Sequence, residues 1–359
     1  MVLASNDKYL VSLASSTKIG DFWWDQTRSL GWNRSRADHE THWISSEGSY
    51  LVLHPNSPSA ESTNKSPSDS ASEEPSTADI NPEAEPLGII LAIPFANKTG
   101  WLGSLVVAEP HRGNGGGALL LDAAVEYLKS KGVNQIGLDS VNDQAPMYKR
   151  RGFETTGTIK VAEREPLGQS PMVPEEGEGP LGEDSEAARV WLSKTLEQMA
   201  DIRGVTGQSL LESDKSCTGL ERRELWLRSQ ALIDREDAWG LAVTRLDDLD
   251  DLRSWVLVRD CEEGYRVGPM YARTKLHALI LLRAIMAKIA VAAEGSQKRL
   301  TAEVWAENPD AFGVFARLGW QETGIEYDRM WLKGDVPEEQ AKGDKADREA
   351  YAWFDAVEG

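Results

Sequence analysis

Residues 104–121 decide how this chain folds, and they read SLVVAEPHRGNGGGALLL. The first four residues have the character of a strand, and four glycines then lead directly into a helix whose apolar face extends from Leu120 to Leu128. Such a loop presents consecutive backbone N–H groups at the positive end of a helix, and glycines let a bulky anion come close. Because Arg112 adds a positive side chain, the sequence predicts a site that binds a pyrophosphate without a metal ion.

Two other interpretations of this loop stay open at this point. Gly113-x-Gly115-x-x-Ala118 also satisfies the dinucleotide-binding fingerprint, and Asp139 follows at roughly the spacing of a ribose ligand. That fingerprint normally follows the first strand of its domain, whereas several expected strands and helices precede this loop. The loop is also compatible with a glycine-rich turn that binds nothing.

Charge and composition exclude some classes of partner. The net charge of −19 over 359 residues lies mostly in three acidic segments, 55–86, 161–186 and 334–359. The rest of the chain is almost neutral, so it lacks the basic footprint that duplex nucleic acid requires. No uncharged apolar run is long enough to span a membrane, and the first residues lack the pattern of a secretory signal, so we expect a cytoplasmic protein. Cys217 and Cys261 show no metal-ligand or redox spacing.

The chain length favours two domains. We expect an N-terminal domain over 1–164, a linker over 165–186, a C-terminal domain over 187–333 and an acidic tail over 334–359. The Ser- and Pro-rich segment 55–86 is expected to be a disordered insertion in the first domain, because its composition cannot bury enough apolar surface.

The second half repeats the plan of the first. Each half is expected to follow a strand–helix–strand–helix–strand order, and Asn308-Pro309 is a strong start signal for the last helix. That helix ends in residues 315–320, FARLGW, which parallel residues 148–153, YKRRGF. The shared aromatic-x-x-x-Gly-aromatic ending indicates a duplicated domain.

The residues of the loop resemble the GNAT superfamily of acyl-CoA N-acyltransferases. Its signature, Arg/Gln-x-x-Gly-x-Gly/Ala after a strand that bends away from its neighbour, is matched by Arg112, Gly115 and Gly117. More narrowly, the chain is similar to the two-domain YitH-type acetyltransferases. That similarity lies in residues 31–33 with Asp38, 138–139, 146–148 and 264–272. The resemblance implies an α/β fold (an α+β GNAT-like arrangement) with two tandem domains, each a mixed, mostly antiparallel sheet flanked by helices.

The resemblance also implies roles for individual residues. The backbone of Leu105, Val106 and Val107 would pair with the pantetheine amides of acetyl-CoA, and Tyr148 would lie near the thioester sulfur. The pyrophosphate would be held by Arg112, Gly113, Asn114, Gly115, Gly116, Gly117 and Ala118. We expect Tyr148 as general acid and Asp139, at the end of its strand, as general base. Weaker candidates for substrate contacts are Trp32, Asp38 and Tyr271, and His39, His111 and Glu303 are further acid–base candidates.

Departures from the superfamily pattern affect both halves. Val141 and Gln144 occupy positions where many members have Asn and Ala, and Phe315 stands at the Tyr position of the second half, which also lacks a glycine loop. Only the first half is therefore expected to bind the cofactor. The function expected is transfer of an acetyl group from acetyl-CoA to the primary amine of a small molecule. The alternatives are a non-catalytic acetyl-CoA-binding module and a dinucleotide-binding oxidoreductase.

Overall fold

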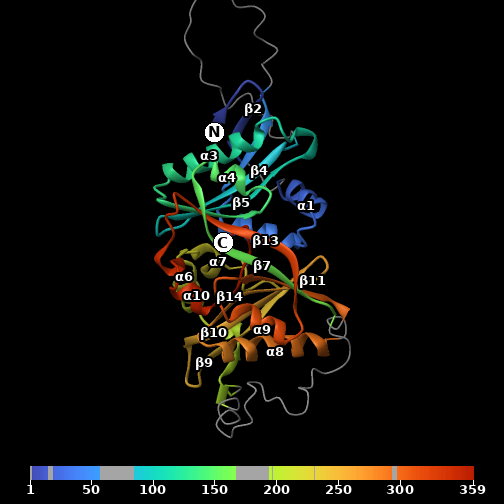
Figure 1. Cartoon of the computed structure of the whole chain (residues 1–359), viewed down its shortest axis with the longest axis vertical. Helices are drawn as coiled ribbons and strands as arrows, with labels where there is room; N and C mark the ends of the chain where they lie inside the picture. The colour runs from blue at the N-terminus through green and yellow to red at the C-terminus, as the bar shows by residue number, and fades with distance from the viewer. Residues whose placement is uncertain are drawn as a thin grey trace, which may run out of the picture.

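The computed structural model describes residues 2–14, 19–56, 85–166, 194–195, 197–229, 231–292 and 297–359. They form one continuous mixed sheet of fourteen strands flanked by helices, in the order β1-β2-β3-β4-β5-β6-β13-β7-β12-β14-β11-β10-β9-β8 (Figure 1). Most of the expected insertion 55–86 and of the expected linker 165–186 lies outside these residues. Within the part of the chain described, no helix is long and apolar enough to cross a membrane.

The first half of the chain builds the β1 end of the sheet. Its elements are β1 (Val2–Ser5), β2 (Tyr9–Leu13), α1 (Ile19–Ser29), α2 (Arg36–Ser45), β3 (Tyr50–Pro55), β4 (Gly88–Pro94), β5 (Thr99–Val107), α3 (Gly116–Ser130), β6 (Gln135–Val141), α4 (Ala145–Lys149) and β7 (Phe153–Arg164). Strands β1 and β2 were not expected from the sequence. The expected apolar face of α3 is confirmed, because Leu120, Leu121, Ala124 and Leu128 are all buried against the sheet.

The second half builds the other end of the sheet. Its elements are β8 (Met199–Asp201), α6 (Gly207–Thr218), α7 (Arg223–Leu227), β9 (Ala238–Arg245), β10 (Asp248–Cys261), β11 (Gly264–Ala272), α8 (Lys275–Val291), β12 (Arg299–Trp305), α9 (Ala311–Arg317), β13 (Gln321–Leu332), α10 (Lys345–Glu349) and β14 (Ala350–Trp353). Asn308 does not cap α9 as expected. Its Oδ1 accepts from the amide of Asp310 at 3.0 Å, so it closes the turn before the helix, which begins at Ala311.

The duplicated ending is visible in the geometry of both halves. Gly152 and Gly319 adopt left-handed φ values of +83° and +80°. The ring of Tyr148 meets the ring of Phe153 edge-on at 6.1 Å, and the ring of Phe315 meets that of Trp320 edge-on at 5.0 Å. The same turn therefore brings the same two aromatic positions together in each half.

The two halves share their central strands. Strand β13, from the second half, lies between β6 and β7 of the first half, and β7 pairs in turn with β12 of the second (Figure 1). All of these pairings are antiparallel. Each half thus completes the sheet of the other, and one hydrogen-bonded ladder runs through the whole molecule.

The expectation of an acidic tail over 334–359 is wrong. Strand β14 lies inside the sheet, antiparallel to both β11 and β12. Tyr351, Trp353 and Phe354 are buried, and two acids of the segment, Asp355 and Glu358, are buried as well. The aromatic side chains supply the buried apolar area that orders the segment. Because arginines neutralise Asp355, the acidic composition does not prevent the segment from packing into the sheet.

Candidate functional site

Strands β5 and β6 separate in the middle of the sheet. They pair in parallel only from Thr99–Leu102 with 135–138, and beyond Leu102 they diverge. A bulge in β5, between Gly103 and Val106, starts the divergence. Ser104 lies at this bulge with a left-handed φ of +50°, and its Oγ accepts from Trp23 Nε1 at 3.1 Å. The strand that bends away from its neighbour, which the sequence led us to expect, is therefore present.

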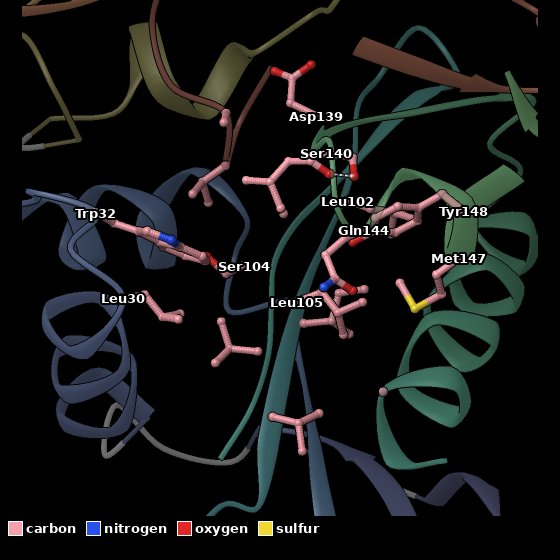
Figure 2. Close-up of a pocket in the computed structure, with 18 of the residues that line it drawn as sticks. Leu30, Trp32, Leu102, Ser104, Leu105, Asp139, Ser140, Gln144, Met147 and Tyr148 are labelled. Atoms are coloured by element: carbon pink, nitrogen blue, oxygen red, sulfur yellow. Dashed lines mark hydrogen bonds between the residues drawn. The ribbon is translucent and has the colours of Figure 1, made fainter. Parts of the chain in front are cut away.

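A cavity of about 540 Å³ fills the gap between the two strands. Residues 102–107 of β5 form one wall and residues 139–141 of β6 another. Figure 2 shows Gln144, Met147 and Tyr148 on one side of the cavity, facing Leu30 and Trp32 across Ser104 and Leu105. Leu30 and Val141 line the cavity and remain 39% and 41% exposed, so they mark its mouth.

The glycine loop closes one end of the cavity. Gly115 is the N-cap of α3 with a φ of +87°, and Gly113 has a φ of +75°, values that strain any residue with a Cβ. A Cβ on Gly116 would lie 2.6 Å from Leu53 Cδ2, whereas the space beside Gly117 holds only Val107 within 4 Å. The glycines therefore have two roles. Gly116 allows close packing on β3, and the others keep the approach to the N-terminus of α3 open.

The structure distributes the expected cofactor residues between the cavity wall and the loop behind it. Leu105, Val106, Val107, Arg112, Gly113 and Gly117 line the cavity. Asn114, Gly115, Gly116 and Ala118 are not among its lining residues, although they belong to the same loop and helix start. Nε of Arg112 donates to the carbonyl of Val107 at 2.8 Å, which fixes this side chain across the end of β5.

Tyr148 lies beside the divergence of β5 and β6. It is carried by α4, lines the cavity and is 9% exposed. Its ring packs edge-on against Phe153. Burial raises the pKa of its hydroxyl above the usual value, so the group carries its proton at neutral pH.

Asp139 lines the cavity, but its carboxylate does not face it as expected. Its side chain is fully buried, and both carboxylate oxygens accept from Arg329, at 2.9 Å from Nε and 2.8 Å from Nη2. The residue as a whole is only partly buried, so it presents its backbone to the cavity, and in Figure 2 the carboxylate points away from Tyr148. Burial raises the pKa of this carboxyl to about 6, against the lowering by Arg329. The expectation that Asp139 takes the proton of a substrate is corrected, because its carboxylate lies behind the wall.

Sequence reasoning missed three residues that the second half or distant loops bring to this site. Arg329, on β13, stacks on Trp353 with its guanidinium carbon 4.1 Å from the ring centroid. Tyr327, also on β13, lines the cavity, and burial raises the pKa of its hydroxyl to about 12. Arg34 lines the cavity from the loop after α1. No local signal marks the two β13 residues, because only the exchange of strands brings them here.

Arg34 is neutralised where it meets the cavity. Its guanidinium is 4% exposed and pairs with Asp355 and with Glu303, the latter at 3.3 Å. Glu303 in turn pairs with Arg266. The charged groups behind this wall thus pair with one another, although Arg34 Nε and Glu303 Oε2 have no hydrogen-bond partner among the described residues. The part of the cavity formed by Leu30, Trp32 and Tyr327 is mainly apolar and aromatic.

Two of the weaker candidates are corrected. Asp38 is 1% exposed and pairs with Arg235 and Arg259 at 3.0 and 3.1 Å, away from the cavity lining. Although burial raises the pKa of Asp38, the two guanidinium groups hold it below its usual range. Tyr271 is 2% exposed in the core of the second half, where its hydroxyl donates to Asp214 at 2.9 Å. Trp32 and His111 do line the cavity.

The corresponding gap in the second half is closed. Strands β11 and β12 pair in parallel from residue 264 to 266 and then diverge, as β5 and β6 do. Strand β14 fills this gap and bonds to both neighbours. Phe315 is fully buried there, and α8 begins at Lys275 without a glycine loop. Among the described residues, no cluster of three or more His, Cys, Asp or Glu is placed to hold a metal ion.

The dinucleotide interpretation is also corrected. A dinucleotide-binding domain is built on a mostly parallel sheet whose first strand precedes the loop. Here β5 is the fifth strand, antiparallel to β4, and only its start is parallel to β6.

Comparison with known proteins also favours an acetyltransferase fold over a dinucleotide-binding one. Residues 25–153 match the model of the acetyltransferase (GNAT) family. A Pyrococcus horikoshii protein assigned as an acetyltransferase superposes with a TM-score of 0.66 at 16% identity, over 99% of this chain and 98% of its own. The N-myristoyltransferase of Saccharomyces cerevisiae, solved with myristoyl-CoA, gives 0.56 at 9% identity, over 99% and 91%. A tandem GNAT protein from the clavulanic acid pathway gives 0.54 at 12% identity, over 90% and 97%. No curated protein matches the sequence.

Proposed function

We propose, from the match of residues 25–153 to the model of the acetyltransferase (GNAT) family, that the protein transfers the acetyl group of acetyl-CoA to the primary amine of a small molecule. The single observation that carries the proposal is the open gap between β5 and β6, with the glycine loop at one end and Tyr148 beside it.

The residues present fit coenzyme A. The backbone amides at the start of α3 and the side chain of Arg112 suit a pyrophosphate, since Gly113 and Gly115 have open space where a Cβ would stand. The edge of β5 from Leu105 to Val107 has lost its neighbour β6 and lines the cavity, so the backbone groups on this edge suit the amides of pantetheine, apart from the Val107 carbonyl, which accepts from Arg112 Nε. The thioester is the chemistry that the bound coenzyme supplies.

Tyr148 donates the proton in this proposal. Acyl transfer to an amine requires a proton for the departing thiolate, and the Tyr148 hydroxyl is protonated at neutral pH and lies beside the cavity. The amine binds as the free base, and the proton that it loses on forming the amide passes to solvent water at the mouth between Leu30 and Val141, from which Tyr148 regains its proton before the next turnover. Asp139 supports the wall from behind through Arg329.

The acceptor side favours an amine with an apolar or aromatic body. Leu30, Trp32 and Tyr327 provide the surface, and the charged side chains behind it, Arg34 and Asp139, are already paired. A polycationic acceptor would find no unpaired carboxylate among these lining residues. Trp32 is our candidate for direct contact with the acceptor.

Release of free thiol tests the proposal. Purified protein is incubated with acetyl-CoA and a library of aryl, alkyl and sugar amines, amino acids, polyamines and peptides, and coenzyme A is followed as free thiol. We expect turnover with at least one small apolar or aromatic amine. Tight binding of acetyl-CoA without turnover on any amine would instead favour a non-catalytic module.

A further inference from the structure

The cavity has a closed end opposite the glycine loop. From the loop, the wall follows β5 backwards from Val107 to Ser104, and it ends where β5 and β6 meet at Leu102 and Leu138. On the proposed function, the pantetheine runs along this wall towards Ser104. The acyl group that it carries therefore points towards the junction of the two strands.

The segment 354–359 crosses this closed end. Ala356 and Val357 both line the cavity, and the end of the chain lies between the two halves of the molecule (Figure 1). The carbonyl of Ala356 accepts from Trp101 Nε1 at 3.1 Å. The backbone of Val357 lies so close to Gly103 that a Cβ there would stand 2.1 Å from its carbonyl oxygen. The glycine therefore permits the segment to sit directly on β5 at the base of the gap.

The segment is held from several sides. Nη2 of Arg259 donates to the carbonyl of Phe354 at 3.0 Å and to Oδ2 of Asp355 at 2.8 Å, and Arg34 also pairs with Asp355. Nη1 of Arg222 donates to the carbonyl of Gly359 at 2.7 Å. These donors are buried arginines, so displacing the segment would leave buried charges unpaired. The end of the cavity is a fixed wall.

The same stretch of chain also enters the gap in the second half. Strand β14, residues 350–353, lies between β11 and β12 and pairs with both, and the chain then continues into the base of the gap between β5 and β6. One segment thus blocks a ligand from the gap in the second half and limits the depth of the cavity in the first half.

We propose that Ala356 and Val357 form the end wall of the acyl compartment and restrict the enzyme to short acyl groups. This inference rests on the proposed function and adds its acyl specificity. The cavity of about 540 Å³ has to hold part of the coenzyme and the acceptor as well as the acyl group. A chain of several methylenes meets Ala356 and Val357 at this end, because both residues line the cavity and the contact of the Val357 backbone with β5 holds them in place.

Binding of an acyl-CoA series tests the inference. Dissociation constants of acetyl-, butyryl- and hexanoyl-CoA are measured by calorimetry for the full chain, for Val357→Ala and for Ala356→Val. We expect the wild type to bind acetyl-CoA at least tenfold more tightly than hexanoyl-CoA. Val357→Ala should lower the ratio of the hexanoyl-CoA to the acetyl-CoA dissociation constant by about fourfold for each additional methylene of the acyl chain that the cavity holds. Ala356→Val should raise this ratio.

Val133→Ala is the matched control, because Val133 is 5% exposed and lies outside the cavity lining. It should lower stability without changing the ratio. Equal binding of all three acyl-CoAs by the wild type, or a ratio that neither Val357→Ala nor Ala356→Val changes, overturns the inference. Absence of binding for every acyl-CoA overturns the proposed function instead.

Discussion

Arg329 lies directly opposite Asp139 in the antiparallel pairing of β13 with β6, and it donates two hydrogen bonds to that carboxylate. The pair joins the two halves of the chain at the wall of the cavity. Trp101 and Trp353, one from each half, flank the guanidinium with ring centroids 4.9 and 4.1 Å from its central carbon. The second half is therefore part of the site of the first.

Removing one partner of this pair should destabilise the fold strongly. Arg329→Met leaves the buried Asp139 carboxylate unpaired, and we expect a loss of about 3–5 kcal/mol in the free energy of unfolding. The double variant Arg329→Met with Asp139→Leu should regain most of that loss, since both charges are then gone. Urea unfolding of the two single variants and the double variant measures the coupling. A double variant no more stable than Arg329→Met contradicts the prediction.

The same double variant also tests the corrected role of Asp139. Because the carboxylate lies behind the cavity wall, we expect the folded double variant to keep kcat within about tenfold of the wild type. Direct proton transfer to Asp139 would instead cost about 10²–10⁴-fold.

Tyr148→Phe should lower kcat while leaving the binding of coenzyme A intact. The substitution removes the proposed proton donor but keeps the ring against Phe153, and we expect kcat to fall by about 10²-fold or more. Tyr127→Phe is the control, because Tyr127 is also buried in the same core but its hydroxyl contacts Ser49, away from the cavity. Steady-state rates with calorimetric dissociation constants separate the two effects. Equal rates for both variants would remove Tyr148 from the chemistry.

Glu358 should make stability fall as the pH rises towards neutrality. Burial raises its pKa from 4.5 to about 7, so between these values the unfolded chain has lost a proton that the folded chain keeps. Relative to Glu358→Gln, the wild type should lose up to about 3 kcal/mol from pH 4.5 to 7. Titration of histidines distant from Glu358 cancels in this difference, whereas the contribution of His42, whose Nε2 lies 3.9 Å from Glu358 Oε1, remains. Chemical unfolding at several pH values measures it, with Glu126→Gln as an exposed control, and a pH-independent difference rules the effect out.

The shared strands predict a single unfolding transition. Strands β7 and β13 each pair with strands of both halves, so neither half keeps its sheet when the other unfolds. Differential scanning calorimetry should give one peak with equal calorimetric and van't Hoff enthalpies. Two resolved transitions, or a stable fragment 1–164, would show that the halves are independent.

The local features of this chain follow from its sequence, and the long-range ones do not. The loop before α3 and the buried face from Leu120 to Leu128 were predicted, because glycine spacing and periodicity act over a few residues. The bend of β5 was expected only from the family resemblance of the loop. Periodicity shows which side chains are buried but not which strand lies beside them. The exchange of β7 and β13 was therefore missed.

The sequence also did not predict which charged residues pair, because local patterns do not show which distant residues meet. Arg329 and Asp139 are 190 residues apart, and nothing near either of them identifies the other. The segment 334–359 was interpreted from its acidic composition, yet its aromatic residues and the arginines of other elements decide its place in the sheet. Composition describes a segment alone, whereas burial depends on the partners that the fold brings to it.

Titration calorimetry of coenzyme A into the intact protein and into Gly117→Glu tests the central claim most directly. Gly117 lines the cavity at the start of α3, so a carboxylate there should repel the pyrophosphate, and Gly313→Glu, at an open helix position, is the control. We predict one coenzyme A per chain for the wild type and the control, and a loss of at least about 100-fold in affinity for Gly117→Glu, where about 1.4 kcal/mol corresponds to tenfold. No binding by the wild type, a second equivalent in the C-terminal half, or unchanged affinity in Gly117→Glu would contradict the account.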